Sequence, residues 1–78
     1  MKIDKNTREN AGYIIIMSEK YSDKHEIVLG RNKNGQWVTW ECETKNNNYF
    51  WGHYFNEEKH ALEDYHRRLL KNYELIPF

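Results

Sequence analysis

The 78-residue chain has few residues that could cross-link it covalently or insert it into a bilayer. It contains one cysteine and one proline, and its longest apolar run is YIIIM at 13–17. A single cysteine cannot form an internal disulfide, and a lone thiol is typical of proteins in a reducing compartment. The apolar run is too short to span a membrane, and residues 1–12 lack the apolar stretch of a secretory signal. We therefore predict one small cytoplasmic domain with no membrane partner.

A surplus of positive charge is also missing, because twelve basic side chains balance twelve acidic ones. Residues 36–58 hold seven of the twelve aromatic residues but only one basic group beside four acidic ones. Proteins that bind nucleic acid directly normally present a basic footprint to the phosphates. Arg67, Arg68 and Lys71 could touch phosphate, but acidic residues interrupt this cluster and predict an ordinary solvated helix face. The composition therefore does not favour direct nucleic-acid binding.

Motifs for catalysis, cofactors and metals are absent from the sequence. It has no glycine-rich phosphate loop before a helix, no serine elbow, and only a single Glu-x-x-His, at Glu63 and His66. Cys42 and His53 could suggest a thiol–imidazole pair, but no third orienting residue is evident and the two are expected on opposite faces of a sheet. We predict that the protein is not an enzyme, binds no cofactor or metal, and uses Cys42 structurally.

The residues that are present predict an α+β domain. Turn signals separate four β-branched or aromatic segments, and a helical spacing follows them, with Leu62, Tyr65, Leu69 and Tyr73 on one face. The expected strands are 13–20, 25–32, 37–43 and 49–55, and the expected helix runs from an N-cap at Asn56 to about residue 75. We predict a flexible tail at 1–11 and a domain at 12–78. This domain would be a four-stranded antiparallel meander with the C-terminal helix on one face.

The turn at Asn34-Gly35 sets the predicted register of this sheet. Both residues suit a two-residue type I′ hairpin, which would pair Lys33 with Gln36. Counting outward from the turns predicts the core face beneath the helix: Ile27, Leu29, Val38, Trp40, Cys42, Phe50 and Tyr54. Gly52 would oppose Trp40 and leave room for its indole ring.

The other face of the predicted sheet would be uncovered and rich in aromatic and acidic side chains: Val28, Trp37, Thr39, Glu41, Glu43, Tyr49, Trp51, His53 and Phe55. We predict that a protein partner with a basic surface binds six of them: Trp37, Glu41, Glu43, Tyr49, Trp51 and His53. Three alternatives stay open: the rings stabilise the sheet by cross-strand pairing, the N-terminal tail covers them, or a homodimer buries them. An RNA-binding sheet is less favoured, because Glu41 and Glu43 would repel phosphates.

One resemblance gives these expectations a biological setting. The segments VLG, VTWEC and YFWGHYF and the acidic helix ending in RL, all within residues 26–69, resemble small proteins of phages and mobile elements in Gram-positive bacteria. This resemblance assigns no role to any residue. It implies a stoichiometric inhibitor of a bacterial defence nuclease, similar in action to an anti-CRISPR protein, in the host cytoplasm. The alternatives are a nucleic-acid-binding accessory protein and a structural homodimer.

Overall fold

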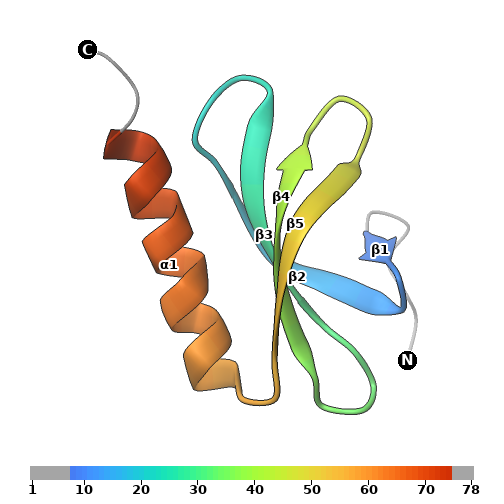
Figure 1. Cartoon of the computed structure of the whole chain (residues 1–78). Helices are drawn as coiled ribbons and strands as arrows, with labels where there is room; N and C mark the ends of the chain where they lie inside the picture. The colour runs from blue at the N-terminus through green and yellow to red at the C-terminus, as the bar shows by residue number, and fades with distance from the viewer. Residues whose placement is uncertain (1–7, 75–78) are drawn as a thin grey trace.

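The fold, taken from a computed structural model that describes residues 8–74, is an antiparallel sheet with one C-terminal helix (Figure 1). The strands follow in the order β1-β2-β3-β4-β5. Their bounds are β1 (Glu9–Asn10), β2 (Tyr13–Lys20), β3 (His25–Arg31), β4 (Trp37–Glu43) and β5 (Asn48–Phe55), and the helix is α1 (Glu58–Glu74). The predicted class is confirmed, but the sheet has five strands instead of four.

The extra strand comes from a tight hairpin at the N-terminus. Ala11 and Gly12 both have positive φ, at 51° and 84°, and they connect β1 to β2. This turn was not predicted, because alanine seldom adopts positive φ. Of the predicted tail at 1–11, residues 1–7 lie outside the described part of the chain, whereas Glu9 and Asn10 form β1 and Ala11 belongs to the turn that follows it. Residues 75–78 and the side chains of Tyr73 and Glu74 also lie outside it.

The loop between β3 and β4 is one residue longer than predicted, which corrects the register. The side chain of Asn32 organises this loop, because its Oδ1 accepts hydrogen bonds from the amides of Asn34 at 3.0 Å and Gln36 at 2.9 Å. Only Gly35 has positive φ in the loop, as in a type I turn followed by a left-handed residue. Arg31 therefore pairs with Trp37, and Lys33 does not pair with Gln36.

A shift of one residue moves β3 side chains to the other face relative to β4, so the predicted faces were wrong. Ile27 and Leu29 share a face with Trp37 and Thr39, and α1 covers this face (Figure 1). The buried apolar residues here form what we call the helix-side cluster: Ile27, Leu29, Trp37, Ala61, Tyr65 and Leu69. The helical positions expected to face the core are confirmed for Tyr65 and Leu69, whereas Leu70 is exposed.

Four residues predicted beneath the helix lie instead on the sheet face away from it: Val38, Trp40, Cys42 and Tyr54, of which Tyr54 is 61% exposed beside Trp40. Val28, Val38, Trp40 and Cys42 form a second buried group, here called the opposite-side cluster. The first half of β2 packs on this group through Tyr13 and Ile15 and, with β1, lies on the side of the sheet away from α1 (Figure 1). A register shift between Ile15 and Met17 marks a bulge in β2, and bulges of this kind increase strand twist.

A polar strap closes the edge of the opposite-side cluster. Arg8, next to β1, donates to the carboxylate of Glu26 at 2.8 Å and to the hydroxyl of Tyr49 at 3.1 Å. The same guanidinium lies 3.4 Å from the sulfur of Cys42. Burial, together with the charge of Glu26, raises the pKa of the Cys42 thiol to about 11. A thiol held in its protonated form is a poor nucleophile, which fits a structural Cys42.

Within residues 8–74, no helix combines the length and apolar character needed to cross a bilayer.

Candidate functional site

A bulge in β5 creates the most exposed aromatic side chain of the described chain. In the β4–β5 ladder Glu41 pairs with Phe50 and Thr39 pairs with His53. Trp51 and Gly52 therefore both lie opposite the single residue Trp40. Trp51 has a φ of 54°, and its side chain is turned outward with the residue 70% exposed. Gly52 is required here because a Cβ atom would lie 2.6 Å from the indole nitrogen of Trp40. The predicted contact of Gly52 with Trp40 is thus confirmed.

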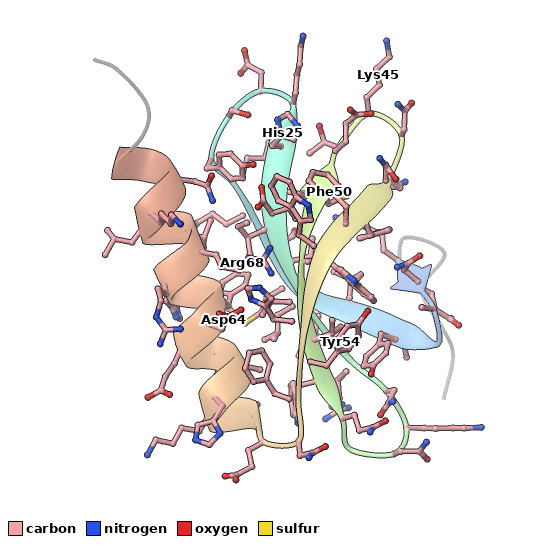
Figure 2. All side chains as sticks on the ribbon, in the orientation of Figure 1. His25, Lys45, Phe50, Tyr54, Asp64 and Arg68 are labelled. Carbon is pink, nitrogen blue, oxygen red and sulfur yellow. The ribbon has the colours of Figure 1, made fainter. Side chains whose placement is uncertain are left out.

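A buried arginine from the helix holds this bulge in place. Arg68 donates from Nη2 to the carbonyl oxygen of Trp51 at 2.7 Å. It also donates from Nη1 to the carbonyl and hydroxyl oxygens of Thr39, at 3.1 and 3.0 Å. In Figure 2 the side chain of Arg68 reaches from α1 toward the sheet. The guanidinium therefore connects α1, β4 and β5 at one point and fixes the backbone beneath the exposed indole.

Two carboxylates surround Arg68 and are themselves engaged. Asp64 accepts a hydrogen bond from the Thr39 hydroxyl at 2.5 Å, and its Oδ2 lies 4.0 Å from Arg68. Glu41 accepts from the Tyr21 hydroxyl at 2.7 Å and lies 3.6 Å from Arg68. Burial, with the hydrogen bond to Glu41, raises the pKa of the Tyr21 phenol, which keeps it a donor. The charges inside this network are thus largely compensated.

An open groove of about 570 Å³ lies over this network, between β5 and α1. Its lining consists of Glu41, Trp51, His53, Asp64, Arg67, Arg68, Lys71 and Asn72. The side chain of Arg67 is 70% exposed, and its ion pair with Asp64 is long, at 3.5 Å. Lys71 is exposed, and it forms no ion pair within the described residues. Glu41 and Asp64 are already engaged by hydrogen bonds and by Arg68 beneath the groove. The accessible charge at the rim, from Arg67 and Lys71, is therefore positive.

His53 completes the groove as an oriented imidazole. Its Nδ1 lies 2.9 Å from Oδ2 of Asp64, and a carboxylate partner makes this nitrogen the protonated one. The side chain is 53% exposed, so the rest of the ring is open to a ligand. Such a pair could serve as a general base, but the groove lining contains no serine, threonine or cysteine to act as nucleophile. Residues 8–74 also contain no cluster of three or more potential metal ligands.

The six residues predicted to form one exposed binding face are separated in the structure. Glu41, Trp51 and His53 line the groove. Trp37 is 8% exposed in the helix-side cluster, where the Arg31 guanidinium lies 5.7 Å from its ring. Tyr49 packs against Trp40 on the opposite face, and Glu43 accepts a hydrogen bond from Asn46 in the β4–β5 loop.

Arg68 was predicted on a solvated face of the helix, but it is buried, and so is its neighbour Asp64. A signal for their burial was present. They lie four residues apart, next to Tyr65 and Leu69, on the same helical stripe. Two opposite charges on the buried stripe of a lone helix indicate a buried ion pair that reaches into the sheet.

No family model, no curated protein and no solved structure matches this chain.

Proposed function

We propose that this chain is a non-catalytic binding protein whose contact surface is the groove between β5 and α1 together with the indole of Trp51. The observation that carries the proposal is the hydrogen bond from Arg68 to the Trp51 carbonyl. It fixes an exposed tryptophan beside a basic rim before any ligand arrives. Fixing a contact residue in advance reduces the entropy lost on binding.

The sign of the rim charge favours a negatively charged ligand. The sequence had predicted a basic partner, because Glu41 and Glu43 were expected to face outward beside the rings. The residue Glu41 is instead only partly exposed and paired below the groove, and Glu43 lies outside it. The accessible groups are Arg67 and Lys71, which attract carboxylates or phosphates. Inhibition of a bacterial defence nuclease stays a prediction from the resemblance, and the groove would then take an acidic part of that enzyme.

A second candidate function is self-association through β2. Its residues Ile14, Ile16 and Met17 are 43%, 45% and 39% exposed. The helix packs mainly on β3, β4 and β5, so this apolar strip lies outside its main contact. Sedimentation measured over a range of protein concentrations would detect a dimer, and Ile16→Lys would abolish it.

The proposal is tested by nuclear magnetic resonance with acidic probes of two kinds, a short polyglutamate peptide and a short oligothymidylate. At least one probe should shift the indole signal of Trp51 and the amides of 51–53 and 67–72. The double variant Arg67→Gln/Lys71→Gln should lose these shifts, whereas Lys33→Gln/Lys45→Gln, with the same change of charge elsewhere, should keep them. Absence of any shift with both probes would contradict the proposal.

A further inference from the structure

We infer that the groove binds single-stranded nucleic acid, with a base stacked on Trp51 and neighbouring phosphates held by Arg67, Lys71 and His53. This inference rests on the proposed function and names the ligand class of the same site. It combines the two features that sequence-tolerant single-strand binders share, which are an aromatic stacking surface and adjacent positive charge.

The stacking surface extends beyond Trp51. The ring of Phe50 meets Trp51 edge to face at 5.1 Å, and His25 lies 6.5 Å from Phe50 in the same manner. Tyr21 stacks on His25 at 5.9 Å. These four rings form an aromatic row that leads from the groove across the sheet, and Figure 2 labels His25 and Phe50 within it. Trp51 is the exposed end of this row, and the other three are half-buried.

The phosphate contacts come from one stripe of α1 and from β5. Arg67 and Lys71 are four residues apart, so they project from the same side of successive helical turns. His53 adds a ring nitrogen across the groove, and its ring is held in place by the contact of Nδ1 with Asp64. The charged groups that face His53 are Asp64, Arg67, Arg68, Lys71 and Glu41, and the two acids among them are already engaged.

The main objection to nucleic acid, raised from the sequence, does not apply to this surface. That objection was that Glu41 and Glu43 would repel phosphate from an exposed platform, but Glu43 does not line the groove. In the structure the Glu41 side chain is 12% exposed and lies beside Arg68. Glu63 is exposed one turn before Arg67 and is the acid placed to oppose a phosphate there. An acidic peptide would satisfy the rim charge as well, but it would leave the flat indole without a stacking partner, so we favour nucleic acid.

The test is a titration with a short oligothymidylate, followed by tryptophan fluorescence and by the anisotropy of a labelled oligomer. Trp37 and Trp40 are buried, so quenching reports on Trp51. We expect a dissociation constant on the order of 0.1 mM at physiological salt. Trp51→Ala should weaken binding roughly 5- to 150-fold, as loss of one stacked base does.

Salt dependence and matched variants distinguish phosphate contacts from other effects. Arg67→Gln and Lys71→Gln should each reduce the slope of log affinity against log salt by about 0.7. Glu63→Gln should tighten binding, and Lys45→Gln, at the tip of the β4–β5 loop, should leave it unchanged (Figure 2). Thymidine monophosphate should bind more weakly than the oligomer. Equal affinity for the two would overturn the assignment to a strand.

The remaining outcomes separate this inference from the proposed function. If the oligomer fails to bind but polyglutamate binds with a dependence on Arg67 and Lys71, the inference is wrong and the binding function stands. If neither probe binds a folded protein, both are wrong.

Discussion

The two faces of this sheet are closed by different means. On one face α1 packs over an apolar cluster, but the seam between helix and β5 is polar and holds Asp64 and Arg68. On the other face the first half of β2 packs over Val28, Val38, Trp40 and Cys42, and Arg8 straps the edge. The difference indicates a division of roles. The opposite-side cluster is covered by its own chain, whereas the helix side leaves an open groove above a fixed polar network.

The largest effect is expected from Trp37, which tests whether α1 covers the face assigned to it. Trp37→Ala should lower the free energy of unfolding by about 3–5 kcal/mol, because it removes a large buried ring from the helix-side cluster. Urea unfolding measures the change. Trp51→Ala is the control and should change the value by less than about 0.5 kcal/mol. Equal stability of Trp37→Ala and wild type would mean that the faces are reversed.

The next effect concerns the polar seam. Arg68→Met should lower the free energy of unfolding by about 3 kcal/mol, because Asp64 and Glu41 would lose their buried cation. This value is the low end for a broken buried pair, since the groove is open to water. Arg67→Gln, one residue away but exposed, should cost less than about 0.5 kcal/mol. Similar losses in the two variants, compared by thermal unfolding, would contradict a special role of Arg68.

The bulge provides a third test, which links both faces. Gly52→Ala should destabilise the fold by about 1–3 kcal/mol, since the new methyl group would overlap the Trp40 indole. Trp40→Phe shortens that ring system, so the double variant should lose less than the sum of the single changes. Strict additivity in this cycle would show that Gly52 and Trp40 are not in contact.

The smallest effect is a pH dependence from the sealed face. The pKa of Cys42 rises from the ordinary 9.0 to about 11 in the fold, so the thiol of the unfolded chain loses its proton first. This contribution to stability is complete below pH 9 and is lost as pH rises toward 11. The loss should be on the order of 1 kcal/mol and absent in Cys42→Ala. Urea unfolding of both proteins between pH 8 and 11 isolates it, because other alkaline effects are shared. Parallel curves would show that Cys42 is not shielded.

Local patterns predicted most of the fold. The strands at 13–20 and 37–43 have the bounds of β2 and β4, and the helical spacing correctly placed Tyr65 and Leu69 in the core. The register was harder, because it depends on a single turn. Asn34-Gly35 suits a type I′ hairpin, but the side chain of Asn32 stabilises a loop one residue longer. Local propensity cannot separate these two turns, and a slip of one residue exchanges the faces.

Only part of the candidate site could be predicted from the sequence. Trp51 and His53 were correctly expected to be exposed, and both line the groove. The positions of their neighbours Asp64 and Arg68 on the buried stripe of the helix indicate burial, but no local pattern shows which strands they contact. The bulge at Trp51 was also missed, because it depends on the size of Trp40 across the sheet. Sites built from such long-range contacts require the fold itself.

The bulge at Trp51 has a further consequence for the solubility of the protein. The strand β5 ends the sheet, and the open side of a terminal strand can template fibril growth by pairing with another chain. Trp51 has a left-handed backbone conformation, which interrupts the regular hydrogen-bond pattern in the middle of β5. A neighbouring molecule would therefore find two short stretches of strand in place of one long one. The same distortion that presents the indole thus protects the molecule from assembling edge to edge.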